Sequence, residues 1–239
     1  MRASVPREGE APRPKWVNGQ IEVSDVASRL LFPTSEQGPW LPYERFAETM
    51  ATSRKIEGPH PHEAEELVVY VLEGFVDHAY DGKHEALAEG SVLVLTAHDE
   101  IRHELVMKKG RSARWLSIVL RIPGHAERFP TAVVTRTVGD PIAGSDGTVQ
   151  RPVVGTRARA SAFTGLECTD IEFAKEGTSF LRIGRARKGI AYALRGTGSI
   201  GDDRLEPGQG VLVERASGLA VRGTPGFRLL LTTVPRPPD

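Results

Sequence analysis

Two pairs of matching segments show that the sequence contains an internal repeat. Residues 70–74 (Tyr-Val-Leu-Glu-Gly) correspond to residues 192–196 (Tyr-Ala-Leu-Arg-Gly), and residues 89–94 (Glu-Gly-Ser-Val-Leu-Val) correspond to residues 207–212 (Pro-Gly-Gln-Gly-Val-Leu). A chain of 239 residues is long enough for two small domains that each bury a core of their own. The repeat therefore predicts two copies of one fold in tandem.

Short apolar runs separated by turn residues indicate that the copies consist of antiparallel β-strands. In the first copy these runs cover residues 67–72, 75–80, 91–95, 104–107 and 115–122. Asp81-Gly82 stands between two of them and favours a type I′ hairpin turn, in which both central residues have positive φ. Residues 43–52 are predicted to contain one of the few helical turns. We therefore expect an all-β protein with two antiparallel β-barrels in tandem.

Composition indicates where the two barrels divide. Residues 1–20 are rich in Pro, Gly and charged residues, so we expect them to form a loose arm. Residues 123–146 again carry Pro, Gly and Asp at short intervals, which is typical of a linker. We expect the N-terminal barrel to span residues 1–130 and the C-terminal barrel to span residues 131–239.

Three histidines of the first copy have the spacing of a metal site. His60 and His62 are two residues apart and lead into an apolar run, so on a strand their imidazoles leave from the same face. A meander of antiparallel strands can bring His103 back beside them. The corresponding positions of the second copy hold arginine, glycine and valine, which do not suit a metal. We therefore predict a metal site in the N-terminal barrel and a degenerate C-terminal barrel without metal ligands.

The order of these residues resembles the first domain of the pirins, which are two-barrel members of the cupin superfamily. The resemblance rests on His60-Pro61-His62, Glu66, residues 70–74, Gly90 with Thr96-Ala97, and His103. It implies a bicupin, that is, two cupin-type barrels in tandem. It also implies one divalent transition metal, with Fe(II) as the expected ion and Ni, Cu, Zn and Mn as the alternatives.

The fourth metal ligand is the point at which the sequence departs from the pirin pattern. Pirins typically carry a glutamate two residues after the third histidine, but here that position is Leu105, and Glu104 comes one residue early. Glu104 faces the metal only if a β-bulge turns it inward. Glu66, at an even spacing from His62, is an equal candidate, and a three-histidine site closed by water is the third possibility. A glutamate that is not a ligand is expected to act as the catalytic base for a substrate hydroxyl.

Charge and hydropathy narrow the classes of partner. The formal net charge is zero, and no aromatic platform accompanies the basic residues of the segment 182–188, so we expect no nucleic-acid partner. No run approaches the roughly twenty apolar residues of a membrane span. Residues 1–15 lack the apolar core of a signal peptide. We therefore expect no membrane contact and a cytoplasmic location.

Two functions are compatible with these features. The resemblance to pirins with quercetin 2,3-dioxygenase activity implies a non-haem oxidoreductase or dioxygenase. Its small-molecule substrate would be phenolic or enolisable, like a flavonol. The alternative is a non-catalytic, redox-sensing regulator whose metal state alters a surface that binds a protein partner. The sequence contains no phosphate-binding loop and no nucleophile elbow that would indicate another chemistry.

Overall fold

The computed structural model describes residues 15–18, 20–23, 27–32, 39–51, 57–107, 111–122, 129 and 131–236. These residues form antiparallel strands without any helix, so the predicted all-β class is confirmed. None of them forms a helix that could cross a membrane. The chain divides into two compact units, which we call the N-terminal barrel and the C-terminal barrel. The N-terminal barrel contains residues 19–141 and 151–168, and the C-terminal barrel contains residues up to 18, residues 142–150 and residues from 169 onward.

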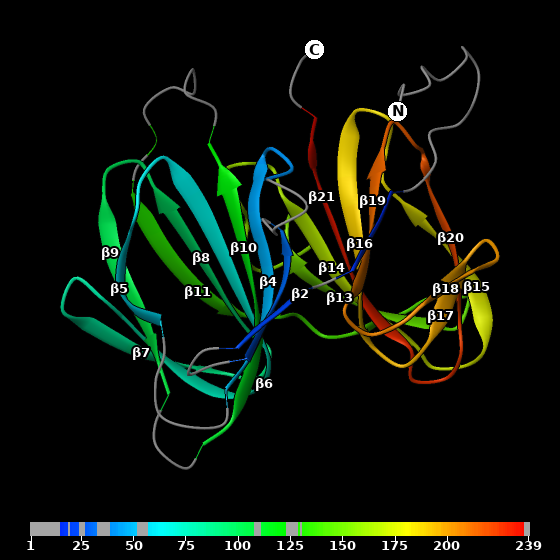
Figure 1. The fold of residues 1–239 in the computed structure, drawn as a ribbon, viewed down its shortest axis with the longest axis horizontal. Coiled ribbons are helices and arrows are strands. Elements are labelled where there is room, and N and C mark those ends of the chain that lie inside the picture. Colours follow the sequence, from blue (N-terminus) through cyan, green and yellow to red (C-terminus); the bar gives the residue numbers. More distant parts are fainter. Residues whose placement is uncertain are drawn as a thin grey trace. The chain divides into compact units, whose positions relative to one another are not determined.

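The N-terminal barrel is built around the long strand β6 (Figure 1). Its strands are β2 (Gln20–Val23), β3 (Ala27–Phe32), β4 (Tyr43–Ala51), β5 (Glu57–His62), β6 (Glu65–Tyr80), β7 (Lys83–Ala88), β8 (Ser91–Ala97), β9 (Ile101–Val106), β10 (Ala113–Arg121) and β11 (Ala132–Thr137). The main sheet has the order β11-β8-β6-β10-β4-β3-β2. The C-terminal part of β6, residues 75–80, pairs with β7 and β9, and β9 also pairs with β5. This second set of strands carries the histidines.

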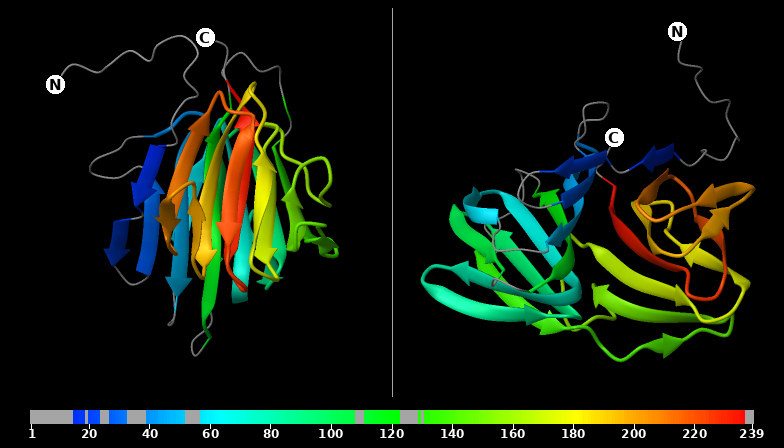
Figure 2. Two further views of the ribbon diagram at one scale, coloured as in Figure 1. Left: turned by 90° about the vertical axis from the view of Figure 1, so that its right-hand side faces the viewer. Right: turned by 60° about the horizontal axis from the view of Figure 1, so that its bottom comes forward.

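The C-terminal barrel consists of two sheets (Figure 2). Its strands are β1 (Lys15–Asn18), β12 (Ile142–Ala143), β13 (Thr148–Val154), β14 (Glu167–Phe173), β15 (Gly177–Arg182), β16 (Arg187–Arg195), β17 (Gly198–Ile200), β18 (Asp203–Leu205), β19 (Gln209–Glu214), β20 (Gly218–Gly223) and β21 (Arg228–Pro235). One sheet has the order β1-β19-β16-β21-β14-β13-β12 and the other the order β15-β20-β17-β18.

Three local predictions can be compared with the strands. The Asp81-Gly82 turn has φ values of 47° and 72°, so both central residues have the positive φ that was predicted. The helical turn predicted for residues 43–52 is wrong, because residues 43–51 form β4. There, pairing with β3 and β10 on both edges outweighs the weak local preference for helix. Part of the predicted loose arm is β1, which pairs with β19, and residues 1–14 lie outside the described residues.

The boundary predicted between residues 130 and 131 stays a prediction. β11 follows this position and pairs with β8 of the N-terminal barrel. Residues 151–168 also belong to the N-terminal barrel, although residues 142–150 belong to the C-terminal one. The chain therefore passes between the two units more than once.

β6 exchanges its inward and outward faces near Gly74. The register between β6 and β10 shifts by one residue just before this glycine, which has a φ of 76°. A Cβ atom at Gly74 would lie 2.0 Å from the carbonyl oxygen of Ser112, so no other residue fits. Before the bulge, odd-numbered residues such as Val71 enter the core, and after it even-numbered residues such as Val76 do. The same exchange turns His78 inward.

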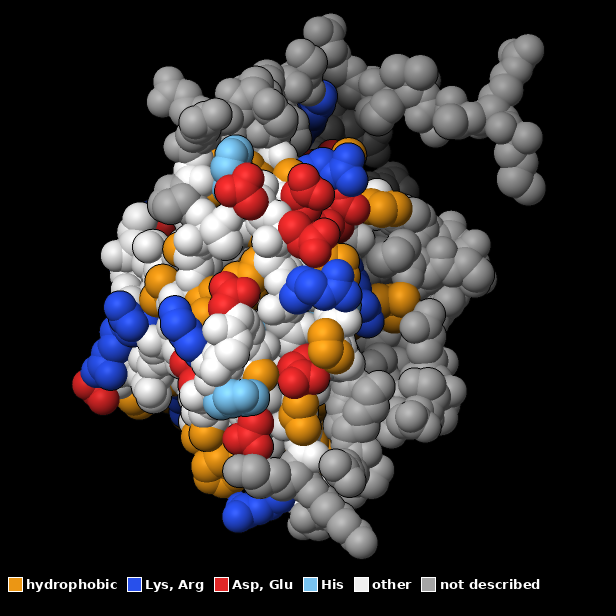
Figure 3. Space-filling view, turned by 90° about the vertical axis from the view of Figure 1, so that its left-hand side faces the viewer, with side chains coloured by type: hydrophobic (Ala, Val, Ile, Leu, Met, Phe, Trp, Pro, Cys, Tyr) orange, Lys and Arg blue, Asp and Glu red, His pale blue; other side chains and the backbone are white. Residues whose placement is uncertain are grey.

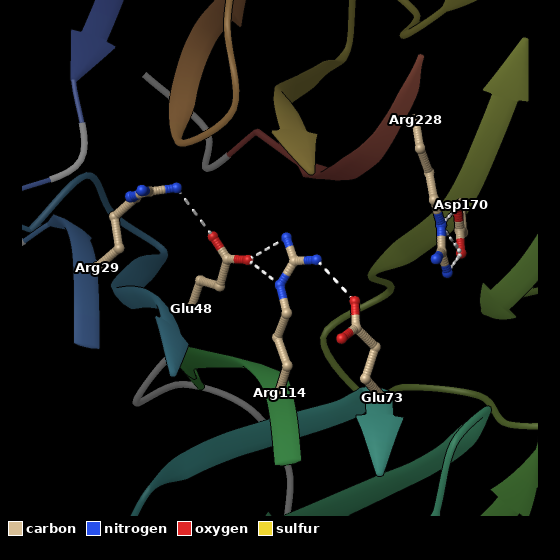
Figure 4. Close-up of polar contacts among 6 residues, drawn as sticks. All are labelled: Arg29, Glu48, Glu73, Arg114, Asp170 and Arg228. Atoms are coloured by element: carbon tan, nitrogen blue, oxygen red, sulfur yellow. Dashed lines mark hydrogen bonds and ion pairs between the residues drawn. The ribbon is translucent and has the colours of Figure 1, made fainter. Parts of the chain in front are cut away.

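Buried ion pairs connect the outer faces of the strands (Figure 4). Glu48 of β4 is 1% exposed and accepts hydrogen bonds from Arg114 of β10 at 2.5 Å and from Arg29 of β3 at 3.5 Å. Arg114 also donates to Glu73 of β6 at 3.0 Å. Burial acts to lower the pKa of Arg114, but the carboxylates of Glu48 and Glu73 outweigh it and raise that pKa. The network connects four neighbouring strands of the main sheet.

The C-terminal barrel has a comparable pair. Arg228 of β21 donates from Nε and Nη2 to the carboxylate of Asp170 on β14, at 2.9 and 2.5 Å (Figure 4). Asp170 is fully buried, and the forked geometry of arginine suits a carboxylate. This pair joins two neighbouring strands of the larger sheet.

Candidate metal centre

Three histidines of the N-terminal barrel converge. β5 and β9 are antiparallel neighbours, and their register places His60 directly opposite His103. His62 lies two residues further along β5 and therefore shares the face of His60. The Nε2 atom of His103 lies 3.0 Å from Nε2 of His60 and 3.1 Å from Nε2 of His62. The structure thus brings the three predicted histidines into one cluster.

Two of the rings are held by hydrogen bonds from their other nitrogen. His60 Nδ1 lies 3.0 Å from the carbonyl oxygen of Gly58, and His62 Nδ1 lies 2.7 Å from Oε2 of Glu65. A carbonyl or an ionised carboxylate can only accept, so each Nδ1 carries the proton and donates it. The Nε2 atom of each ring then presents its lone pair to the cluster, which is the orientation that a metal ligand needs.

The spacing of the nitrogens fits a metal ion. Bonds of about 2.1 Å at right angles around one ion place neighbouring nitrogens about 3.0 Å apart, and tetrahedral angles place them about 3.4 Å apart. The two separations from Nε2 of His103, 3.0 Å to His60 and 3.1 Å to His62, match the right-angled spacing. Three neutral imidazoles are a donor set that suits Fe, Ni, Cu or Zn and leaves further coordination positions for water or substrate.

The environment keeps His103 neutral. Burial lowers the pKa of His103, and the neighbouring His60, His62 and His78 lower it further, to about 2. The ring therefore retains a lone pair at neutral pH and can bind a cation without first losing a proton.

Glu66 lies outside the cluster. Its carboxylate is fully buried and accepts hydrogen bonds from the backbone N–H of Phe163 at 2.7 Å and of Thr164 at 3.0 Å. The hydroxyls of Thr164 and Thr96 donate to it as well, at 2.5 and 3.0 Å. Although Glu66 is an even number of residues from His62, the two side chains do not share a strand face, because β5 ends at His62 and β6 begins at Glu65. Ala64, between the two strands, has a φ of 54°.

Glu104 also lies outside the cluster. The pairing of β9 with β6 is regular, with Tyr80 opposite His103 and Ala79 opposite Glu104. Without a bulge, successive side chains of β9 alternate, so His103 and Leu105 face inward and Glu104 faces the other way. Leu105 is fully buried in the hydrophobic core. The roles predicted for Glu66 and Glu104 as ligand or base stay predictions, and the geometry favours neither residue.

Two residues beside the cluster were not predicted from the sequence. Glu65, rather than Glu66, reaches the histidines and binds His62. His78 is fully buried, and its ring centroid lies 5.3 Å from that of His103. The alternation of Val76, His78 and Tyr80 could have indicated an inward histidine, but only if the bulge at Gly74 had been recognised.

A pocket of about 260 Å³ lies beside the cluster. His60 and His62 line one part of it, Leu67 and Val119 supply apolar surface, and polar residues of β4 and β10 complete it. Figure 3 shows the outer face on the side of β5, β7 and β9, where Lys and Arg lie among Asp and Glu and histidine side chains reach the surface. His62 and His103 are buried, whereas His60 is partly exposed, and His60 and His62 are the two histidines that line this pocket.

Replacing Glu65 with glutamine should weaken metal binding. The charge-assisted hydrogen bond to His62 Nδ1 is lost, so the ring is neither oriented nor made more basic. Such a loss typically lowers metal affinity about 10- to 100-fold. Competition with a chromophoric chelator measures this affinity. Glu63→Gln, at an exposed neighbouring position, is the matched control, and an unchanged affinity in Glu65→Gln would contradict the role of Glu65.

The metal-free protein should lose stability as the pH falls below about 6.5. Burial lowers the pKa of His78, and that of His103 is lowered to about 2, whereas both histidines have ordinary pKa values in the unfolded chain. Below the unfolded value the unfolded chain binds more protons than the folded one, so the free energy of unfolding decreases. Urea midpoints should therefore be lower at about pH 5.5 than at about pH 7.5. A midpoint that does not change, or that rises at the lower pH, would contradict the prediction.

The chain has the fold of a bicupin, two cupin-type barrels in tandem, with one candidate metal centre. Among the described residues, the group of His60, His62 and His103 is the one whose ligand atoms are close enough to hold a metal, and the C-terminal barrel contributes none. The predicted two-barrel cupin fold is confirmed by likeness to solved structures.

Solved structures that share this fold include a bacterial pirin and a quercetin 2,3-dioxygenase. The bacterial pirin YhhW from Escherichia coli, in complex with nickel(II), has a TM-score of 0.79 at 16% identity over 94% of this chain and 100% of that one. A quercetin 2,3-dioxygenase from Acinetobacter baumannii has a TM-score of 0.81 at 15% identity over 93% of this chain and 79% of that one. The protein GK1651 from Geobacillus kaustophilus has a TM-score of 0.82 at 18% identity over 94% of this chain and 97% of that one.

At these identities the likeness is one of fold, and at that level the predicted resemblance to pirins is confirmed. No protein-family model and no curated protein sequence matches the chain.

Proposed function

We propose that the protein is a metal-dependent oxidoreductase of the non-haem dioxygenase type. Its substrate is a small oxygenated molecule that is phenolic or enolisable, like a flavonol. The observation that carries this proposal is the convergence of the Nε2 atoms of His60, His62 and His103 beside a pocket. The likeness in fold to a nickel-bound pirin and to a quercetin 2,3-dioxygenase supports it.

The three histidines hold the ion, and no carboxylate of the described residues completes the site. Fe(II) is the expected ion, with Ni, Cu, Zn and Mn as alternatives. When bound, such an ion supplies Lewis-acid or one-electron chemistry to an oxygenated substrate. Water or the substrate would complete the coordination in place of Glu66 or Glu104. The hydrogen bonds that Glu66 accepts from residues 163 and 164, and the regular pairing of β9 at Glu104, support this.

The chain itself contributes orientation and exclusion of water. Gly58 and Glu65 fix the rings of His60 and His62, so the ligand nitrogens are in place before the ion arrives. Leu67 and Val119 give the pocket apolar walls that remove water from a bound substrate.

Metal analysis followed by oxygen uptake tests the proposal. Purified protein is assayed for bound metal and then for oxygen consumption with a panel of phenolic and enolisable compounds. Turnover that is lost in His60→Ala and in His103→Ala supports the enzyme. Tightly held iron without oxygen uptake, together with a co-purifying protein, would instead favour the redox-sensing regulator.

A further inference from the structure

Arg45 introduces a positive charge into the pocket beside the histidines. It lies in β4 opposite Val119 of β10, and Val119 belongs to the hydrophobic core. Residues that pair directly across antiparallel strands face the same side, so Arg45 also points into the barrel. Both residues line the pocket of about 260 Å³, together with His60 and His62.

The polar atoms of Arg45 and Ser117 lack partners. Arg45 Nε and Ser117 Oγ are both buried, and neither has a hydrogen-bond partner in the described part of the chain. A buried donor without a partner destabilises the folded protein, and more so when the group is charged. Both residues line the same pocket, so one ligand can satisfy the two of them.

The acidic residues of the pocket do not neutralise Arg45. Glu65 is bound to His62, and Glu44 forms an ion pair with Arg121. Among the described lining residues, Arg45 is therefore a cation without a counter-ion. A guanidinium presents forked donors that match the two oxygens of a carboxylate, so the missing partner has the chemistry of an organic acid.

We propose that Arg45 and Ser117 form an anion subsite and that the substrate is a small organic acid. Its carboxylate binds Arg45, and its hydroxyl or carbonyl oxygen faces His60 and His62. A pocket of 260 Å³ is smaller than the roughly 300–1,000 Å³ of sites for drug-sized ligands, so a single ring or a short chain is favoured over a complete flavonol. This assignment rests on the proposed function, because it names the substrate class of the same site.

Matched pairs of acids and neutral amides test the anion subsite. The probes are 3,4-dihydroxybenzoate against 3,4-dihydroxybenzamide and 2-hydroxybenzoate against its amide. Binding is measured by calorimetry without oxygen, on zinc-loaded and on metal-free protein. At least one acid should bind about 10- to 100-fold more tightly than its amide, and Arg45→Gln should remove this preference without changing affinity for the amide. Arg45→Lys should retain part of it.

Equal binding of acid and amide by the unmodified protein would overturn the anion subsite, and so would a preference that survives in Arg45→Gln. If Arg45→Gln does not fold, Ser117→Ala serves instead and should lower the affinity for the acid more than that for the amide. Failure to bind zinc would contradict the metal-dependent function alone, because the metal-free protein still reports the preference for the acid.

A separate observation concerns His78. Its Nδ1 lies 3.0 Å from Oε1 of Glu85, which also accepts a hydrogen bond from Thr135 at 2.8 Å. The carboxylate can only accept, so Nδ1 of His78 carries the proton and Nε2 holds a lone pair. That Nε2 is buried and has no partner in the described part of the chain.

The neighbouring His103 has a buried donor, where His78 has a buried acceptor. Its Nε2 faces the cluster, so as a metal ligand it must carry its proton on Nδ1, and Nδ1 is buried without a partner in the described part of the chain. The two rings lie 5.3 Å apart between centroids at an angle of 64°. An unpaired donor and an unpaired acceptor are thus neighbours, and metal-binding histidines almost always donate their second N–H.

We also infer that His78 is a positioning residue that accepts the Nδ1–H of His103, directly or through one water, when a metal is bound. His78→Phe replaces the imidazole with a somewhat larger aromatic ring that has no acceptor, so metal affinity should fall about 10- to 100-fold. His78→Gln, whose side-chain oxygen can accept, should restore part of it. His84→Ala, at an exposed position of the same hairpin, is the control.

Proton NMR of the Co(II)-loaded protein separates this role from a merely structural one. The shifted, exchangeable N–H signal of His103 should exchange faster with solvent in His78→Phe, whereas the signals of His60 and His62 should not change. Unchanged affinity and unchanged exchange would overturn the inference. If His78→Phe does not fold, Glu85→Gln provides the same test, since it weakens the hydrogen bond that orients His78.

Discussion

We expect metal content to fall to background when His103 is replaced by alanine, and we expect the same result for His62→Ala. Each change removes one of the three nitrogens of a cluster in which Nε2 of His103 lies 3.0 Å from that of His60 and 3.1 Å from that of His62. The remaining pair can no longer surround an ion. Loss of a ligand exceeds the effect of losing a residue that only supports one, so affinity should fall by more than about 100-fold. Elemental analysis after dialysis against a weak chelator measures the outcome.

His84→Ala is the matched control for the loss of metal, because His84 is an exposed histidine of the same barrel. It should retain the full metal content. Stoichiometric metal in folded His103→Ala protein would show that the cluster is not the metal centre. Circular dichroism of each variant shows whether the β-structure is intact, so that loss of the fold is not mistaken for loss of a ligand.

The largest effect on stability is expected from Glu66→Ala. The change leaves two backbone N–H groups of residues 163 and 164 and the hydroxyls of Thr96 and Thr164 without their acceptor. Glu66 is fully buried, so water cannot replace it freely. Breaking a buried network of this kind costs about 3–5 kcal/mol in the free energy of unfolding. Denaturation by urea, monitored by tryptophan fluorescence, measures this change.

Glu104→Ala is the control for Glu66→Ala, since the structure shows no hydrogen bond to the Glu104 side chain among the described residues. Its effect on stability should stay within about 0.5 kcal/mol. Folded Glu66→Ala protein should keep its metal, because Glu66 fastens a loop and does not contact the histidines. A loss of metal at unchanged stability would return Glu66 to the role of ligand.

The sequence was sufficient to predict the fold class and the convergence of the histidines. The repeat of residues 70–74 at 192–196 predicted two barrels. The alternation of side chains between the two faces of a strand is a local property that can be read from the sequence. His60 and His62 share a face for that reason. His103 followed from the expected meander of antiparallel strands, which can bring it back beside the other two histidines.

The sequence was not sufficient where a strand changes its inward face. Ala64 has positive φ without being glycine, and it places Glu65 rather than Glu66 beside His62. The bulge before Gly74 turns His78 inward. Each of these irregularities shifts the alternation by one residue. Gly74 is a weak indication of its bulge, whereas Ala64 gives no sign of its positive φ.

The partners of Glu66 were beyond sequence reasoning for another reason. Its carboxylate oxygens accept hydrogen bonds from Phe163 and Thr164, which lie almost a hundred positions further along the chain, in a loop without periodicity. Arg45 was missed because a single arginine in a predicted helical turn resembles any solvated charge. Its significance depends on β4 being a strand whose face lines the pocket.

The hydrogen bonds that Glu66 accepts also have a consequence for biosynthesis. The acceptor is made early, but its donors at Phe163 and Thr164 are translated long after the third histidine. The histidine-bearing barrel therefore cannot be completed on the ribosome until the polypeptide has emerged past residue 164. A fragment that stops near residue 130 would contain most of the barrel strands and the buried Glu66 carboxylate, but it would lack the two backbone donors at residues 163 and 164.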